Sequence, residues 1–148
     1  MSFWQALRIG SSGLTAQRLR LDLISNNIAN AQTTRTEKGG AYQRQDVIFT
    51  ADAKNAALPQ SVLARRGELG TLQEGVRVAQ ITTDTEAGPR VYDPTHPDAD
   101  ANGYVNYPNV DIVVEMTNML SATRSYEANL ASVEAVKRMA LKSLEIGK

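Results

Sequence analysis

The side chains of this sequence that could do chemistry gather between Asp93 and Gly103, a segment that holds the only histidine and three aspartates. Asp93, Asp98 and Asp100 offer oxygen ligands suited to calcium, but they lack the Asp-x-Asp-x-Asp-Gly spacing and distal glutamate of a calcium loop. His96 alone makes neither a catalytic triad nor a metal centre, so we expect a solvated loop residue. Without a phosphate-binding loop either, the sequence predicts no enzyme, cofactor, metal site or small-molecule substrate.

A second polar cluster consists of Asn26, Asn27 and Asn30, near the end of an amphipathic stretch. Asparagine has a mediocre helix propensity, because its amide competes for backbone hydrogen bonds. One interpretation is a fraying helix end with Asn30 near the C-cap. The other is that the amides fix the register between packed helices, as a single polar residue in a coiled coil can do. Under that second interpretation, Asn27→Leu leaves the monomer soluble and impairs its incorporation into an assembly.

The composition excludes several classes of protein. The chain has 148 residues, of which 42% are apolar and only 5% aromatic, so we expect a modest aliphatic core. It has no cysteine, which excludes disulfides, thiolate metal sites and a cysteine nucleophile. Sixteen basic residues balance sixteen acidic ones, so the charge gives no support for nucleic-acid binding.

Two long helices are predicted to position these residues, one at each end of the chain. The first runs over residues 3–31 and the second starts at a cap, Asn109 or Asp111, and stops near Gly147. In both, apolar residues recur at alternating spacings of four and three, as in a coiled-coil seam. The first seam is Phe3, Leu7, Gly10, Leu14, Gln17, Leu21, Ile24, Ile28 and Ala31, and the second is Ile112, Met116, Met119, Thr123, Tyr126, Leu130, Val133, Lys137, Ala140 and Leu144.

The basic, amphipathic N-terminus is also typical of an organellar transit peptide. Its smooth continuation into the rest of the chain argues against that interpretation, and arginines interrupt it too often for a secretory signal. No run approaches the roughly 20 apolar residues of a membrane span.

Short strands bounded by turn residues fill the middle of the chain. We predict strands at 42–50, 75–83, 90–92 and 104–107, with a bulge between Val78 and Ile81, where the alternation slips. We predict that residues 51–70 form a mainly irregular excursion. The predicted fold class is α+β, with two long terminal helices packed as a coiled-coil-like pair and a small antiparallel β unit inserted between them.

A β unit of this size cannot cover two long apolar seams. We therefore expect helices that need neighbouring subunits, and an isolated monomer whose ends are poorly ordered until those subunits supply the missing surface.

The terminal stretches resemble a known family. Ser12-Gly13-Leu14-Thr15-Ala16-Gln17, Leu21-Asp22 and Ser25-Asn26-Asn27-Ile28-Ala29-Asn30-Ala31 are similar to the N-terminal signature of bacterial flagellar rod and hook proteins. The later motifs resemble one proximal-rod member in particular, and they are Val91-Tyr92-Asp93-Pro94, Gly103-Tyr104-Val105, Pro108-Asn109-Val110-Asp111, Glu115-Met116, Asn118 and Ala122-Thr123-Arg124-Ser125-Tyr126-Glu127-Ala128-Asn129. The resemblance covers most of the chain and is weakest over residues 51–70.

The resemblance implies a structural subunit of the flagellar basal-body rod. Such proteins are exported unfolded by the flagellar type III apparatus and assemble in the periplasm into a hollow drive shaft. It implies an axial core made of residues 1–34 and 109–148, with residues 35–108 projecting outward. The implied partners are copies of the chain, other rod proteins, the MS-ring and rod-adaptor region, and the export apparatus.

The residues that we expect at subunit contacts come from both helices. They are Leu7, Leu14, Leu21, Ile24, Asn26, Asn27, Ile28, Asn30, Met116, Met119, Leu120, Arg124, Tyr126, Asn129, Leu130 and Val133. Two alternatives remain: another rod protein of the same family, and an export-linked adaptor whose amphipathic ends bind partner helices or a membrane surface.

Overall fold

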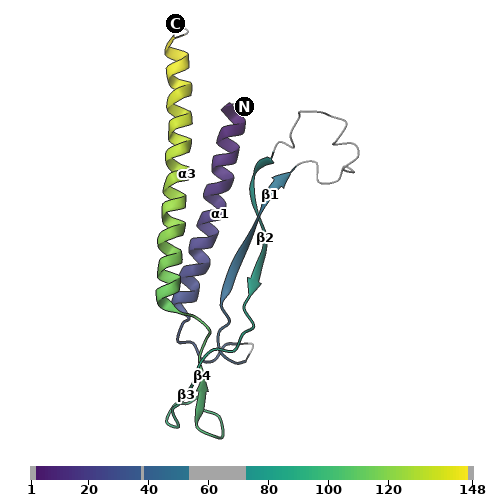
Figure 1. Ribbon diagram of the computed structural model, residues 1–148, viewed down its shortest axis with the longest axis vertical. Coiled ribbons are helices and arrows are strands. Elements are labelled where there is room, and N and C mark those ends of the chain that lie inside the picture. The colour runs from purple at the N-terminus through teal and green to yellow at the C-terminus, as the bar shows by residue number, and fades with distance from the viewer. Residues whose placement is uncertain (1–2, 38, 54–72, 147–148) are drawn as a thin grey trace, which may run out of the picture.

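The computed structural model describes residues 3–37, 39–53 and 73–146, and it has a helix at each end with strands between them (Figure 1). The elements in chain order are α1 (Phe3–Ala29), β1 (Gln45–Ala53), β2 (Gln73–Thr83), β3 (Arg90–Tyr92), β4 (Tyr104–Asn106) and α3 (Ile112–Ile146). The predicted α+β class, with two terminal helices around a small antiparallel β unit, is confirmed.

The two helices run antiparallel, side by side (Figure 1). Two glycines of α1 make their close approach possible. A Cβ atom on Gly10 would overlap the side chain of Val133, and one on Gly13 would lie 3.0 Å from Nδ2 of Asn129. Small residues at such positions let two helix backbones come together, at the cost of helix propensity.

The side of α3 that faces α1 is therefore polar and small. Glu115, Ala122 and Asn129 lie on it, seven residues apart; Glu115 is 1% exposed and Ala122 is fully buried. Met116 and Leu120, which we expected at contacts, remain 56% and 62% exposed on this chain. Glu115 and Ala122 are the buried side chains of α3 among those described, and its large apolar side chains are half-buried or exposed.

Helix α1 is the middle layer of the molecule, between α3 and the hairpin formed by β1 and β2 (Figure 1). Ser12 fastens the hairpin to it, because the Ser12 hydroxyl accepts a hydrogen bond of 3.0 Å from the backbone N–H of Val76. The neighbouring Gly75 is buried with φ of 136°, and a Cβ there would collide with Ser12. Only glycine satisfies both requirements.

The strands form two separate two-stranded antiparallel sheets, β1–β2 and β3–β4. The predicted bulge is confirmed: the register passes from Ile48 opposite Gln80 to Phe49 opposite Val78, which leaves Ala79 unpaired. The β3–β4 hairpin lies at the end of the molecule opposite both termini (Figure 1).

Several bounds differ from those predicted. Helix α1 ends at Ala29, two residues early, and β1 starts three residues later than expected and runs through residues 51–53. The rest of the predicted irregular excursion, residues 54–70, and the stop at Gly147 lie outside the described residues. Asp111 is confirmed as the cap of α3, since its Oδ1 accepts hydrogen bonds from the N–H groups of Val113 and Val114.

The core is small. Its buried apolar residues are Ala16, Leu23, Ile24, Val105 and Ala122, among the parts of the chain that the structure describes. Within those parts, neither helix has a stretch that is apolar enough to cross a membrane.

The close approach at Gly10 predicts a test of helix packing. Gly10→Leu should lower the free energy of unfolding by about 1–3 kcal/mol, because the new side chain must displace Val133. Leucine has the better helix propensity, so packing and propensity predict opposite signs. Urea denaturation followed by circular dichroism measures the difference.

Ser11→Leu is the matched control, since Ser11 is exposed on the same turn of α1. It should change the stability by less than about 0.5 kcal/mol. Equal stability of the Gly10 and Ser11 variants would show that the helices are not packed through Gly10.

Candidate functional site

Asn27 is the buried centre of a network that joins α1, β1 and α3. Its side chain is 0% exposed. Its Nδ2 donates to the carbonyl of Gln45 at 2.8 Å, and its Oδ1 accepts from the N–H of the same residue at 2.9 Å. The amide thus pairs with the backbone of β1 as a neighbouring strand would.

The remaining hydrogen bonds of Asn27 go to two other side chains. Nδ2 also donates to Oε2 of Glu115 at 3.2 Å, and Oδ1 also accepts from the Tyr42 hydroxyl at 2.9 Å. A primary amide has two donors and two acceptor positions. All four are therefore used, by two segments that are far apart in the sequence, residues 42–45 and Glu115 of α3.

Glu115 brings a negative charge into this network. It is 1% exposed, and its Oε1 accepts a hydrogen bond of 2.8 Å from Nε of Arg44. A buried carboxylate is tolerable only when a cation and hydrogen-bond donors face it. Burial would lower the pKa of the Arg44 guanidinium, but the hydrogen bond to Glu115 and the charges of Glu115 and Asp46 outweigh it and raise this pKa.

Tyr42 covers the network on one side. Its hydroxyl donates to Asn27 and accepts a long hydrogen bond, 3.4 Å, from Nδ2 of Asn26. Burial and the nearby charge of Glu115 both raise the pKa of the Tyr42 hydroxyl. We call Asn27, Tyr42, Arg44, Gln45 and Glu115 the polar junction.

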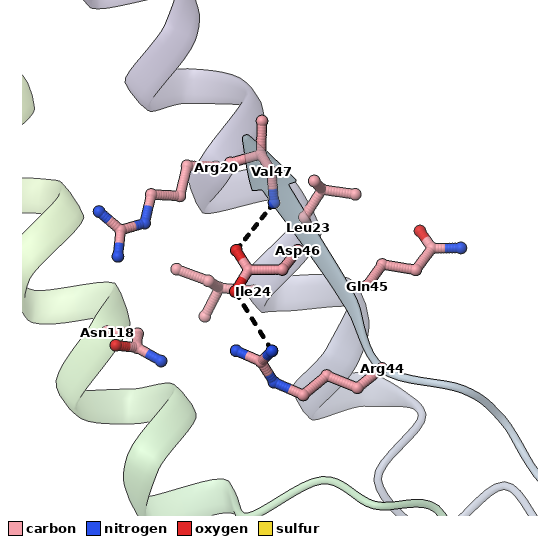
Figure 2. Close-up of a pocket in the computed structure, with 8 residues that line it drawn as sticks. All are labelled: Arg20, Leu23, Ile24, Arg44, Gln45, Asp46, Val47 and Asn118. Carbon is pink, nitrogen blue, oxygen red and sulfur yellow. Dashed lines mark hydrogen bonds and ion pairs between the residues drawn. The ribbon is translucent and has the colours of Figure 1, made fainter. Parts of the chain in front are cut away.

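A cavity of about 60 Å³ lies beside the polar junction. Figure 2 shows Arg20, Leu23 and Ile24 of α1, the Arg44–Val47 segment and Asn118 of α3 around it, with Asp46 bonded to both Arg44 and the N–H of Val47. Its size admits a few water molecules and no organic ligand. It belongs to the packing of the junction and is not a substrate site.

A wider hollow of about 830 Å³ lies where the loops meet below the β1–β2 hairpin. Among the residues that the structure describes, its titratable side chains are Glu37, Tyr42, Glu86 and Tyr107.

The side chains of Asn26 and Asn30 form hydrogen bonds with residues at the C-terminal end of α1. Nδ2 of Asn30 donates to both the carbonyl and Oδ1 of Asn26 at 2.9 Å, and Oδ1 of Asn30 accepts from the Thr33 hydroxyl. The helix ends at Ala29, so Asn30 stands at its C-cap. The two interpretations of the asparagine cluster thus divide between its members.

Asn27 requires a correction. We expected the asparagines to be polar contacts whose partners lie on neighbouring chains, but every partner of Asn27 belongs to its own chain. Because the residue is fully buried before any assembly, it cannot present its amide to another subunit. It does fix the position of one helix against the other, through Glu115, within a single chain.

The carboxylates of the 93–103 segment do not converge on one point. Asp93 accepts hydrogen bonds from the hydroxyl and N–H of Thr95, which hold its pKa below the usual value. Asp98 pairs with Thr34 and Arg35.

Asp100 accepts from the N–H groups of Tyr104 and Asn102, which lower its pKa, and it pairs with Arg90 at 2.7 Å. His96 is half-buried, and its Nδ1 accepts from the N–H of Asp98. The hydrogen bonds and ion pairs of these side chains stabilise the loop. No group of described residues could coordinate a metal ion.

The other residues expected at subunit contacts fall into three classes of exposure on the single chain. Ile24 is buried, and Asn26, Met116, Leu120, Arg124 and Leu130 are exposed. Leu7, Leu14, Leu21, Ile28, Asn30, Met119, Tyr126, Asn129 and Val133 are partly exposed. Asn129 and Val133 contact the glycines of α1.

Sequence reasoning missed Tyr42, Arg44, Gln45 and Glu115 as partners of Asn27. One signal was available: Glu115 is the single charged residue in the run Ile112–Met116, and a lone carboxylate among apolar residues needs a cation. Nothing in the sequence pointed to Arg44 as that cation.

Two family models match the chain. The model described as "Flagella basal body rod protein" matches residues 7–35, and the one described as "Flagellar basal body rod FlgEFG protein C-terminal" matches residues 101–146. The matches cover α1 from Leu7 onward and the whole of α3, and so include both helical sides of the polar junction.

Curated relatives match over the whole chain. The flagellar basal-body rod protein FlgC of Borreliella burgdorferi is 43% identical, with 99% of this chain and 98% of the relative covered. The Bacillus subtilis FlgC is 42% identical with both chains fully covered. The Salmonella typhimurium FlgC is 38% identical over 99% of each chain.

The polar junction predicts that Asn27→Leu destabilises the folded chain itself. The substitution removes the hydrogen-bond partner of the N–H and carbonyl of Gln45 and of Oε2 of Glu115. We expect a loss of about 2–4 kcal/mol in the free energy of unfolding, measured by urea denaturation. Asn26→Leu, at an exposed position on the same turn, is the control and should cost far less. A stable Asn27→Leu chain would contradict the bonding described here.

Tyr42 predicts a pH dependence at alkaline pH. Because folding raises the pKa of its hydroxyl above the usual value of a tyrosine, the folded state favours the neutral phenol. This contribution to stability is fully present below pH of about 10 and is lost as the pH rises through the higher folded-state pKa. The free energy of unfolding of Tyr42→Phe should therefore decline less between pH of about 9 and 12 than that of the parent chain. Tyr92→Phe, at a 64% exposed position, should follow the parent curve, and identical slopes for all three chains would exclude this role of Tyr42.

Proposed function

The chain belongs to the family of flagellar basal-body rod proteins called FlgC, and on that premise we propose that it polymerises through its terminal helices into a hollow, torque-transmitting shaft. The family is structural, and the chain is a structural subunit of the rod of the flagellar basal body. The proposal concerns how this subunit assembles and with what.

The observation that carries the proposal is the large apolar surface that remains on α3 after it has paired with α1. Val113, Met116, Leu120 and Leu144 are between 56% and 72% exposed. A soluble monomer rarely leaves so many large apolar side chains exposed along one helix, and such surfaces are typical of subunit contacts.

In this proposal α1 and α3 form the axial core, and the β1–β2 and β3–β4 hairpins project outward from it. The polar junction supports this division, because it fixes the base of the helix pair to the start of β1. Load applied to the projecting hairpins would pass into both helices through short hydrogen bonds and an ion pair. The proposed neighbours are copies of the chain, other rod proteins and the MS-ring and rod-adaptor region.

We further propose that the subunit reaches the periplasmic part of the rod, its proximal end, as an unfolded chain passed through the flagellar type III apparatus. The small core supports this route, because few buried apolar residues resist unfolding. The expectation that the isolated monomer has poorly ordered helix ends belongs to the same proposal. It is consistent with the absence of buried residues in α3 beyond Ala122, among the side chains described.

The function is tested by the location of the chain. An epitope-tagged copy that restores swimming to a strain lacking the gene should co-purify with detergent-extracted basal bodies and remain after the filament and hook are sheared off. A subunit of the shaft must stay there, whereas an export-linked adaptor would leave with the soluble or membrane fraction. Absence from basal bodies in a motile strain would overturn the proposal.

A further inference from the structure

One face of α1 carries a continuous row of exposed side chains at alternating spacings of four and three. Most of them are small or polar. We call this set the outer row of α1, and it consists of Trp4, Arg8, Ser11, Thr15, Arg18, Asp22, Ser25 and Ala29. Since α3 and the hairpin cover other faces of α1, the outer row is the side available to another chain.

Helix α3 carries a matching row on the side away from α1, again at spacings of three and four. We call it the outer row of α3, and it consists of Val113, Met116, Leu120, Arg124, Glu127, Ala131, Glu134, Arg138 and Leu141, all exposed. Its first three side chains, from Val113 to Leu120, are large and apolar, and most of those that follow are charged. The two rows are complementary in size, because small residues of α1 could receive the large residues of α3.

We propose that the outer row of α3 packs against the outer row of α1 of a second copy of this chain, displaced by one helical turn from the level at which the two helices pair within a chain. This inference rests on the proposed function and names the contact between copies. The occupant is a second copy because its outer row has the spacing, the side-chain sizes and the charges that α3 requires.

The levels of the two helices within a chain are known from three contacts. Gly10 faces Val133, Gly13 faces Asn129 and Asn27 bonds to Glu115. If a neighbouring copy stood at the same height, Arg18 would meet Arg124, and the two like charges would repel.

A displacement of one turn removes that conflict. It brings Arg18 level with Glu127 and Asp22 level with Arg124, so that both pairs have opposite charges. It also sets Thr15 beside Ala131, Ser25 beside Leu120, and Ala29 beside Met116. Arg8 then comes level with Arg138, which is one pair of like charges against the two pairs of opposite charges.

The opposite displacement is unfavourable. It would place Arg18 against Leu120 and Asp22 against Met116, which buries both charges beside apolar side chains. The undisplaced register has a single pair of opposite charges, Arg8 with Glu134. The one-turn displacement has two such pairs and also sets small residues of α1 beside the apolar part of α3, so it is the most favourable of the three registers.

The contact joins two different surfaces, so each copy can offer the same surface to the next. Such a heterologous contact closes into a ring only without displacement along the axis. One helical turn corresponds to about 5 Å. Repetition of the contact therefore produces an ascending spiral of subunits.

The first test reverses the charges of one pair. Asp22→Lys and Arg124→Glu, each alone, should reduce the amount of chain in purified basal bodies at least about tenfold, because like charges then face each other. The chain with both reversals should return to within about twofold of the parent. Lys137→Glu, exposed on α3 but outside the outer row, is the control and should assemble normally.

The second test fixes the register with cysteines, which the natural chain lacks. Thr15→Cys with Ala131→Cys places the thiols level in the proposed register, and Thr15→Cys with Glu127→Cys places them level in the undisplaced one. Within one chain each pair lies on opposite sides of the helix pair, so any disulfide must join two chains. Mild oxidation of cells should give products of two and more chain masses for the first pair only.

The outcomes separate the contact from the function. Normal assembly of both single reversals, no recovery in the double variant, or disulfides to a protein of another size would overturn the contact and leave the rod function intact. Equal crosslinking of the two cysteine pairs would overturn the displaced register. Absence of the parent chain from basal bodies would overturn the function as well.

Discussion

The carboxylate of Glu115 is buried, and the rest of the structure depends on how its charge is compensated. Its two oxygens are bonded to the guanidinium of Arg44 and the amide of Asn27. The first partner lies just before β1 and the second near the end of α1. A buried charge that loses a partner is costly, so the positions of three elements are coupled through one side chain. The aliphatic core is too small to fix these positions by itself.

The close packing of α1 and α3 determines what the molecule can offer to other chains. Gly10 and Gly13 let the helices approach so closely that a Cβ atom there would touch Val133 or Asn129, and the buried side chains of α3 are Glu115 and Ala122 among those described. The large apolar residues of α3 are consequently turned outward. A helix pair with leucines between its members would have been more stable alone, but it would have kept less apolar surface for assembly.

The local features of the structure could be predicted from the sequence, whereas the contacts between distant parts of the chain could not. The four–three spacing located both helices, the Asp111 cap located the start of α3, and the slipped alternation located the bulge at Ala79. Each of these signals is carried by residues close together in the chain. The side of α3 that faces α1 was not predictable from hydrophobicity, because Glu115 and Asn129 occupy it instead of Met116 and Leu130. The bonding of Asn27 was beyond reach too, since half of it goes to backbone atoms of Gln45, whose position depends on the folded chain.

The hydrogen bond between Asn27 and Glu115 spans 88 residues, and this separation bears on the order of folding. Contacts between residues so far apart in the sequence form late, because the intervening chain must first lose conformational entropy. A chain that emerges with its N-terminus first can make α1, and even the start of β1, long before Glu115 arrives. Until then Asn27 and Arg44 lack the partner that joins them to α3. The polar junction therefore cannot form, and the two helices cannot be joined through it, until nearly four-fifths of the polypeptide has appeared.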